Sequence, residues 1–302
     1  MNKQISKSIL SLVLIFAVLL SLSISSYAEN GDTKIKKHLS TIKINEYQKL
    51  KELKDQSDEE LLRKGLSTSE IKEIKDFDYA KELKKRIKAK KEDLSSMGYS
   101  NEQINMMKEI TENQELTVNQ LTALSANCTL SVWEYGHFYN SSLSEVYLEA
   151  DFEWSSIPVF VGTDILAIAW SDGMYPQVNT QTQFETHSQA YYYTVGGIGF
   201  IGSSTYTVIG NTNVGAYVKF PMNKAFTNSG FTVQGYCMNG YLQVYITKKA
   251  AVPEISVLSQ YGHSTVTVSP TVQLKGSPSI TFASTMTTEA EASTYIDLTI
   301  PR

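Results

Sequence analysis

The spacing of apolar positions changes once along the chain, near residue 125. Upstream of this point, apolar side chains recur every three or four residues, as in Ile71, Ile74 and Phe77, a spacing typical of amphipathic helices. From Cys128 onward the dominant period is two, which is typical of half-buried strands. The sequence therefore predicts a helical region followed by a β-rich domain.

The helical region contains an internal repeat, in which residues 61–71 align with residues 94–104. In each copy a helix is expected to end at a glycine, because glycine readily takes the left-handed conformation of a helix C-cap. These glycines are Gly65 and Gly98. A serine then caps the next helix, and an acidic or amide residue three positions later completes a capping box, with Ser67 matched to Glu70 and Ser100 to Gln103. The pattern predicts two tandem helix-turn-helix hairpins.

Two short segments of this region allow a functional interpretation. The loop Met97-Gly98-Tyr99-Ser100 resembles the Met-Gly-Phe/Tyr loop of ubiquitin-associated three-helix domains, and the likeness is confined to this loop. Residues 81–91 form the most basic segment, in which Leu83 and Ile87 lie one turn apart and leave the lysines on the opposite face. A solvated helix face explains these lysines, and contact with an anionic wall polymer or membrane surface is the alternative.

Two segments of the β-rich half have clear strand patterns. Residues 145–154 alternate between an apolar face and a face that carries Glu145, Tyr147, Glu149, Asp151 and Glu153. Residues 164–170 are almost continuously apolar, which predicts a strand buried on both sides. Ser171-Asp172-Gly173 then signals a turn.

Residues 231–247 predict a β-hairpin centred on Asn239-Gly240, the favoured pair for a type I′ turn. A two-residue loop there places Cys237 on the same face as Leu242, and the alternation agrees on both arms. Further strands are expected at 204–210, 214–220, 255–259, 264–274, 278–284 and 293–300. Many short strands predict a mainly β fold, an antiparallel β-sandwich or barrel-like domain preceded by a small charged α-helical hairpin region.

Composition changes at the same place as the periodicity. Residues 31–120 carry 37 of the 58 Asp, Glu, Lys and Arg residues, whereas residues 121–302 carry 18 and hold 26 of the 32 aromatic residues. The β-rich half has 6 basic and 12 acidic residues, a balance that disfavours nucleic acid as a partner. The predicted organisation is a signal peptide at 1–28, a charged helical region at 29–120 and a β-sandwich domain at 126–302.

The N-terminal residues predict export from the cell. Lys3 and Lys7 precede an apolar run from Ile9 to Ile24, and Ser26-Tyr27-Ala28 offers small residues for a signal peptidase. An uncleaved membrane anchor is the alternative. We therefore expect a secreted, extracellular protein, and the lysine- and isoleucine-rich composition with few cysteines is typical of a Gram-positive bacterium. The charged region that follows is also a candidate pro-region, cleaved at a basic pair such as Lys85-Arg86.

The two cysteines, Cys128 and Cys237, are both expected to face the core of the β domain. An even number of cysteines in an exported chain predicts a disulfide between them. Such a bridge would close a loop of about 110 residues and contribute about 4–5 kcal/mol in the chain-entropy model. Two buried free thiols are the alternative.

No catalytic motif stands out in the sequence, so neither catalytic residues nor a cofactor are expected. Glu145, Glu149, Asp151 and Glu153 share a strand face and allow a calcium site or a glycosidase pair, but charge on an exposed strand explains them as well. The tripeptide Tyr-Gly-His occurs at 135–137 and at 261–263, and His187 is a third histidine. None of these histidines has a metal-ligand spacing to another, so no metal is predicted.

Residues 177–215 suggest a hairpin with an unusual tip. Two polar, alternating arms flank the glycine-rich apolar stretch 195–202, and such alternation suits a membrane-inserting β-hairpin. In broad character the segment resembles the insertion hairpins of aerolysin-like pore-forming toxins, while an ordinary hairpin is the simpler alternative. Several tyrosines of this half are expected on outward positions, where their rings suit glycan or protein binding, while a large core with ordinary surface pairs is the alternative. They belong to the set Tyr191, Tyr192, Tyr193, Tyr206, Tyr217, Tyr236, Tyr241 and Tyr245.

The predicted function follows from these features. We expect a secreted, non-enzymatic binding protein that acts on an extracellular surface, glycan or protein partner. A pore-forming or antagonistic toxin that uses the 177–215 hairpin is the second hypothesis, and an extracellular hydrolase is the third.

Overall fold

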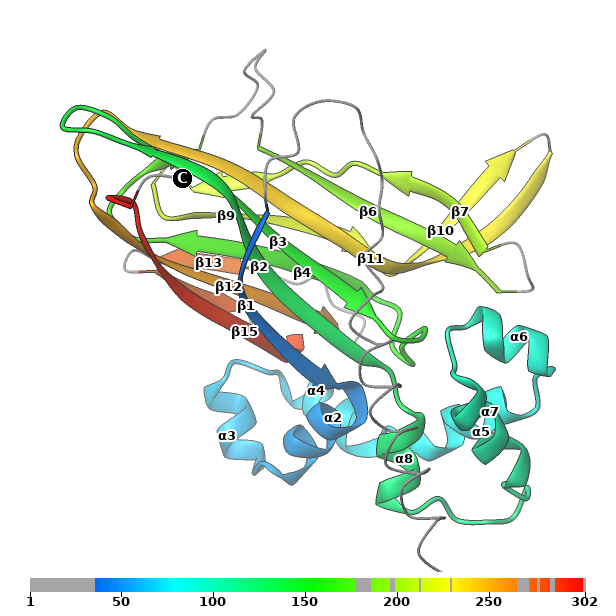
Figure 1. Cartoon of the computed structure of the whole chain (residues 1–302). Helices are drawn as coiled ribbons and strands as arrows, with labels where there is room; N and C mark the ends of the chain where they lie inside the picture. Colours follow the sequence, from blue (N-terminus) through cyan, green and yellow to red (C-terminus); the bar gives the residue numbers. More distant parts are fainter. Residues whose placement is uncertain are drawn as a thin grey trace, which may run out of the picture. The chain divides into compact units, whose positions relative to one another are not determined.

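A computed structural model describes residues 36–176, 186–195, 199–211, 213–228, 230–264, 272–275, 278–282 and 286–300. The signal-peptide prediction therefore lies outside the described residues. The described chain is mostly antiparallel β-sheet with a smaller set of helices, which confirms the predicted fold class. Residues Ile35–Arg302 form one compact unit that contains both the helices and the sheets (Figure 1). Among the described residues, no helix is both long enough and apolar enough to cross a membrane.

Within the described residues the larger sheet, sheet A, has eight strands, six of which follow one another in the order β1-β2-β3-β11-β6-β7. Their bounds are β1 Lys37–Asn45, β2 Asn127–Tyr139, β3 Ser144–Trp154, β11 Phe231–Lys248, β6 His187–Thr194 and β7 Gly199–Ser204. The remaining two strands, β10 (Asn223–Asn228) and β5 (Tyr175–Pro176), also pair with β11. The long strand β11 therefore pairs with four other strands of this sheet in the described residues (Figure 1).

The smaller sheet, sheet B, has the order β15-β12-β4-β9-β8. Its strands are β15 Met286–Asp297, β12 Glu254–Ser264, β4 Thr163–Trp170, β9 Gly215–Pro221 and β8 Ile209–Asn211. Alternate side chains of the two sheets share one core cluster that includes Leu148, Val244, Leu166 and Val218. This shared core makes the domain a sandwich.

Strand β4 is buried on both faces, as its apolar sequence predicts. Leu166 and Ile168 face the sandwich core, whereas Ile165 and Ala167 pack under a short hairpin on the other face. This hairpin consists of β13 (Val272–Lys275) and β14 (Ser279–Phe282). Because both faces of β4 are covered by apolar layers, its sequence is apolar throughout and does not alternate between apolar and polar residues.

The predicted hairpin at Asn239-Gly240 is wrong, because β11 runs through these residues as one strand. Asn239 pairs with Glu153 of β3 and with Tyr191 of β6, and the register to β6 shifts between Cys237 and Asn239. This β-bulge inserts one residue, so Cys237 and Leu242 come to the same face without a turn. Gly240 is explained by close packing, since a Cβ there would lie 2.7 Å from the carbonyl oxygen of Gln189.

The helical region begins with a strand, β1, which pairs with β2 of sheet A. The helices that follow are α2 Glu46–Asp55, α3 Asp58–Arg63, α4 Thr68–Asp76, α5 Tyr79–Ile87, α6 Lys91–Ser96, α7 Asn101–Glu109 and α8 Val118–Leu124. The predicted capping boxes at Ser67 and Ser100 are both formed, and Gly65 and Gly98 both have a positive φ. The two predicted helix-turn-helix hairpins, α3–α4 and α6–α7, are therefore confirmed.

The structure extends this repeat to three helices. The starts of α2, α3 and α4 match the starts of α5, α6 and α7 at the same offset. A side-chain contact repeats as well: the Lys75 ammonium donates to the carbonyl oxygens of Lys54 and Gln56, and Lys108 donates to those of Ile87 and Ala89. Each repeat is thus a three-helix unit whose first and third helices are joined by a lysine.

Cys128 and Cys237 face the core, as predicted, but the predicted disulfide is absent. Both residues are fully buried free thiols. Cys128 lies on β2 and Cys237 on β11, with β3 between these strands. Two strand spacings separate the backbones by about 9–10 Å, whereas a disulfide needs Cα atoms less than about 7 Å apart. Burial raises the pKa of both thiols, so they pack as small apolar groups.

Candidate binding face

Sheet A carries aromatic side chains on the face that points away from the core. These residues alternate along their strands with buried ones. We call this set the aromatic face: Trp133, Tyr135, Tyr147, Tyr191, Tyr193, Phe200, Tyr241 and Tyr245. Most of these rings are half-buried, so each ring offers part of its surface to solvent.

The rings contact one another in two groups. On β2, β3 and β11, the Tyr147 ring centroid lies 5.0 Å from that of Tyr135 and 6.5 Å from that of Tyr245. On β11, β6 and β7, the Tyr191 ring centroid lies 6.3 Å from Tyr241 and 6.2 Å from Phe200. Such contacts hold the rings in place before any ligand arrives.

Glu149 is the polar centre of this face. Its side chain is almost fully buried and accepts hydrogen bonds from the Tyr135 hydroxyl at 2.8 Å and from the Gln243 amide. The Gln243 oxygen accepts from the Tyr147 hydroxyl at 2.6 Å. Burial and the Glu149 charge raise the pKa of Tyr147 to about 12. This tyrosine therefore remains a neutral hydrogen-bond donor at physiological pH.

Lys36 contacts both the carboxylates of β3 and an aromatic ring of β2. Its ammonium pairs with Glu149 and lies 3.5 Å from Asp151, and it sits 4.3 Å from the centroid of the Trp133 ring. The Trp133 indole N–H donates to Asp151 at 2.7 Å. Burial raises the pKa of Asp151 to about 6, although the Lys36 charge opposes this rise.

The four carboxylates of the predicted acidic strand face have different surroundings. Glu149 and Asp151 are held by Lys36 and by neutral donors, whereas Glu153 is exposed and Glu145 is half-buried. Among the described residues, no group of three or more His, Cys, Asp or Glu side chains is arranged to hold a metal ion.

The two Tyr-Gly-His tripeptides have different structural roles. His137 lies 2.7 Å from Glu134 and 2.8 Å from the Ile300 carbonyl oxygen. His263 is fully buried between Asp164 of β4 and Glu46 of α2. Sequence reasoning missed this buried cluster, because Glu46 and His263 are 217 residues apart and no local pattern connects them. His187 begins β6.

The predicted 177–215 hairpin is partly described. β6 and β7 pair antiparallel from Ala190↔Ser204 to Thr194↔Gly199, and β7 is the last strand in the order of sheet A in the part of the chain that the structure describes. Residues 177–185 and the tip residues 196–198 lie outside the described residues. Phe200 of this hairpin is 52% exposed, and Phe231 at the end of the β10–β11 pair is 78% exposed.

Comparisons with known proteins give no family assignment. No known protein family and no curated protein sequence matches the chain. Among solved structures, the chain is similar to one titled "Pore forming protein", with a TM-score of 0.26, 11% identity, and coverage of 57% of this chain and 86% of the other. It is also similar to Clostridium perfringens delta-toxin, with a TM-score of 0.20, 9% identity, and coverage of 58% and 86%. Scores this low do not establish a common fold.

Proposed function

We propose that this protein is a secreted, non-enzymatic binding protein whose aromatic face binds an extracellular glycan. The observation that supports this is the aromatic face itself, where part-exposed rings alternate with hydrogen-bonding groups. Tyr191 and Tyr241 supply rings for stacking on the apolar face of a sugar. The Gln189 amide oxygen accepts from both of their hydroxyls, at 3.1 and 3.2 Å, which keeps these rings oriented.

A glycan suits this face better than an anionic polymer does. The polar groups between the rings include the carboxylates Glu149 and Asp151 and the amides Gln189 and Gln243, and Lys36 is already engaged by both carboxylates. The half-buried Asp151 carboxylate can accept hydrogen bonds from sugar hydroxyl groups, whereas both carboxylates repel phosphate and sulfate. A neutral saccharide is therefore the favoured class of ligand.

The test is binding of the mature protein to a panel of neutral and acidic cell-surface polysaccharides, measured by affinity electrophoresis or calorimetry. Tyr241→Ala and Tyr191→Ala are each expected to weaken binding about tenfold, which corresponds to about 1.4 kcal/mol of lost ring contact. Tyr295→Ala is the matched control, because Tyr295 is 56% exposed on sheet B. Equal binding by all three variants, or no binding to any polysaccharide, would contradict the proposal.

A pore-forming or antagonistic toxin is the second candidate function. It is supported by the β6–β7 hairpin beside β11 and by the exposed phenylalanines Phe200 and Phe231. Release of β6 and β7 would expose Tyr192, which is fully buried and bonds the Tyr206 hydroxyl at 2.6 Å and the Pro221 carbonyl oxygen at 2.9 Å.

Dye release from liposomes separates the two candidates. A toxin would cause leakage that is reduced in Phe200→Ser and Phe231→Ser and unchanged in Tyr295→Ala. A glycan-binding protein would leave liposomes intact and still bind polysaccharide.

A further inference from the structure

The two three-helix repeats each form a hollow at the same place, between the first helix and the segment after the third helix. The hollow of the first repeat has a volume of about 380 Å³ and that of the second about 610 Å³. Six lining residues of each hollow match at the repeat offset: Lys51 with Lys84, Lys54 with Ile87, Asp55 with Lys88, Phe77 with Ile110, Asp78 with Thr111 and Tyr79 with Glu112. The hollow is thus a repeated feature of the fold, which allows one copy to serve as a reference for the other.

The two hollows differ in charge. The first contains Asp55, Asp76 and Asp78 with Lys51 and Lys54, and Lys51 pairs with Asp55 at 2.6 Å. In the second hollow, the residues at the positions equivalent to Lys51 and Asp55 are both lysines, Lys84 and Lys88. Three lysines of α5 and its C-cap lysine line the second hollow, at spacings of three, four and seven residues from the first: Lys81, Lys84, Lys85 and Lys88. They span about 10 Å along the helix.

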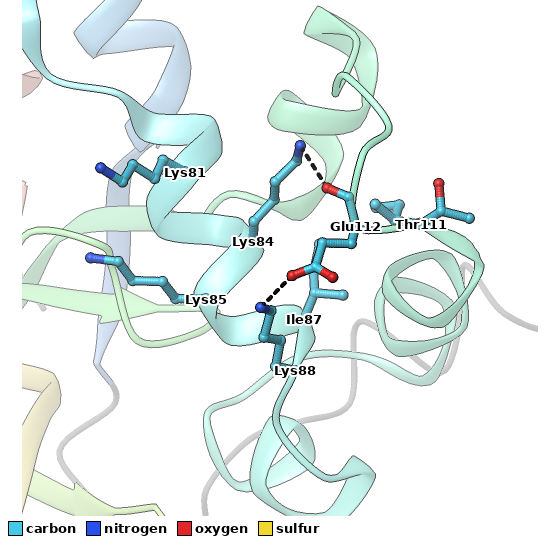
Figure 2. Close-up of a pocket in the computed structure, with 8 residues that line it drawn as sticks. Lys81, Lys84, Lys85, Ile87, Lys88, Thr111 and Glu112 are labelled. Carbon is cyan, nitrogen blue, oxygen red and sulfur yellow. Dashed lines mark hydrogen bonds and ion pairs between the residues drawn. The ribbon is translucent and has the colours of Figure 1, made fainter.

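The acidic partners of these lysines in the described residues are Glu112, which is exposed and is drawn in Figure 2, and Glu82, which is half-buried. Lys88 bonds the Glu112 carboxylate at 2.7 Å, and Lys84 bonds the Glu112 carbonyl oxygen at 3.3 Å. Lys85 pairs with Glu82 at 2.6 Å, and the ammonium of Lys81 has no hydrogen bond or ion pair within the described part of the chain. The Lys88–Glu112 side chains are 68% and 75% exposed, and exposed pairs of this kind contribute little stability. An incoming anion could therefore replace Glu112 at low cost.

We propose that the hollow of the second repeat binds a phosphodiester polymer of a cell surface. Lysine ammonium groups are compact point charges that suit phosphate, and their spacing along α5 lets successive phosphates contact successive lysines. A polymer chain fits a hollow better than a flat bilayer does. In addition, none of the exposed large apolar side chains of the described residues lies between Lys81 and Glu112, so this surface lacks residues that insert into lipid.

The test measures binding of the mature protein to synthetic poly(glycerol phosphate) at several salt concentrations. Lys84→Gln/Lys88→Gln is expected to weaken binding at least about fivefold and to reduce the slope of log affinity against log salt by about two, because each lysine that contacts a phosphate adds about one to that slope. The matched control is Lys51→Gln/Lys72→Gln, which removes the same charge and two exposed ion pairs from the first repeat. The control is expected to bind within twofold of the unchanged protein.

Binding to inorganic phosphate and to phosphatidylglycerol vesicles is measured as well, and the Tyr241→Ala variant separates this site from the aromatic face. Equal binding by the two double variants, no binding of the polymer, or binding only of inorganic phosphate would overturn the proposal, as would capture of phosphatidylglycerol vesicles without capture of the polymer. Tyr241→Ala is expected to bind poly(glycerol phosphate) normally, so failure of the glycan proposal leaves this result unaffected.

Discussion

At the residue scale, the buried cluster around His263 holds three parts of the fold together. One His263 ring nitrogen lies 2.8 Å from Asp164 of β4, and the other lies 3.4 Å from Glu46 of α2. Glu46 also accepts from the backbone N–H groups of Val159 and Phe160 at 3.0 and 2.9 Å and from the Tyr79 hydroxyl at 2.6 Å. Removing one partner from these buried charges would leave an uncompensated charge in the core and would destabilise the fold.

The first prediction concerns the stability of this cluster against pH. Burial alone would lower the pKa of His263, but Asp164 and Glu46 raise it to about 10. The stabilisation from His263 is therefore complete below its unfolded pKa of about 6.5 and is lost as the pH rises through about 10. Burial would raise the pKa of Glu46, yet His263 and the Phe160 and Tyr79 donors lower it overall. Its stabilisation is complete above about pH 4.5 and is lost at lower pH.

We therefore expect the free energy of unfolding to be greatest between about pH 4.5 and 6.5. His263→Gln is expected to lower it by about 3–5 kcal/mol, because Glu46 and Asp164 lose their cationic partner. In the same variant, the free energy of unfolding should fall much less than in the unchanged protein as the pH rises through about 10. Urea unfolding at several pH values measures both effects. His38→Gln is the control, and an equal loss in that variant would contradict the assignment.

Neither this cluster nor the aromatic face could be located from the sequence alone. The sequence predicts that Glu149 and Asp151 share a strand face and that tyrosines point outward. The sequence contains no signal that Lys36 contacts both carboxylates or that Gln243 contacts Glu149, because these contacts join residues 94 to 115 positions apart. Local periodicity determines which face a side chain occupies, whereas strand order determines its neighbours.

At the element scale, strand β11 shows how one pattern can arise from two structures. The buried apolar residues have odd numbers up to Cys237 and even numbers from Gly240 onward, so the alternation shifts by one residue between them. A type I′ turn and a β-bulge both produce this change, and Asn-Gly favours the turn. Ten residues of β11 pair with β3 from Asn239 to Lys248, so ladder contacts on both sides outweigh the local turn preference. The helical repeats were more predictable, because capping boxes and C-cap glycines act within a few residues.

The second prediction tests the bulge. A Cβ at position 240 would lie 2.7 Å from the Gln189 carbonyl oxygen and 2.9 Å from the Phe152 ring. We expect Gly240→Ala to lower the free energy of unfolding by about 1–3 kcal/mol, as overpacking does. Asn239→Ala is the matched control, since it removes only a 3.2 Å hydrogen bond to the Tyr193 hydroxyl, and it should cost less than about 1 kcal/mol. A larger loss in Asn239→Ala than in Gly240→Ala would indicate a turn instead.

At the scale of the whole molecule, the helical repeats are attached to the sandwich by more than their connecting chain. The Arg86 guanidinium donates to the Pro158 carbonyl oxygen at 2.6 Å, to the Ile157 carbonyl oxygen and to the Tyr99 hydroxyl at 3.0 Å. Gly98 has φ +92°, and a Cβ there would lie 2.7 Å from the Ser155 carbonyl oxygen. Phe160, from the β3–β4 connection, belongs to the core of the helical region.

These contacts bear on the hypothesis of a pro-region cleaved at Lys85-Arg86. Arg86 lies in α5 and binds backbone oxygens of the sandwich, so a protease could reach this bond only after local unfolding. We therefore expect the helical repeats to stay attached to the folded sandwich. A helical region that stays attached to the sandwich is compatible with the binding role proposed for the second repeat.

The last prediction is that the helices and the sandwich unfold together. All three tryptophans lie on strands of the sandwich, so tryptophan fluorescence reports the sandwich, while circular dichroism at about 222 nm is dominated by the helices. Coincident urea transitions by both probes are expected, as for a single cooperative unit, together with resistance of the bonds that follow Lys85 and Arg86 to trypsin under native conditions. Arg86→Gln should separate the two transitions and make the other lysines of the helices susceptible to trypsin, because the Ile157 and Pro158 carbonyl oxygens lose their donor. Lys85→Gln should leave the transitions coincident and those lysines resistant. Separate transitions in the unchanged protein, or rapid native cleavage after Arg86, would instead support a detachable pro-region.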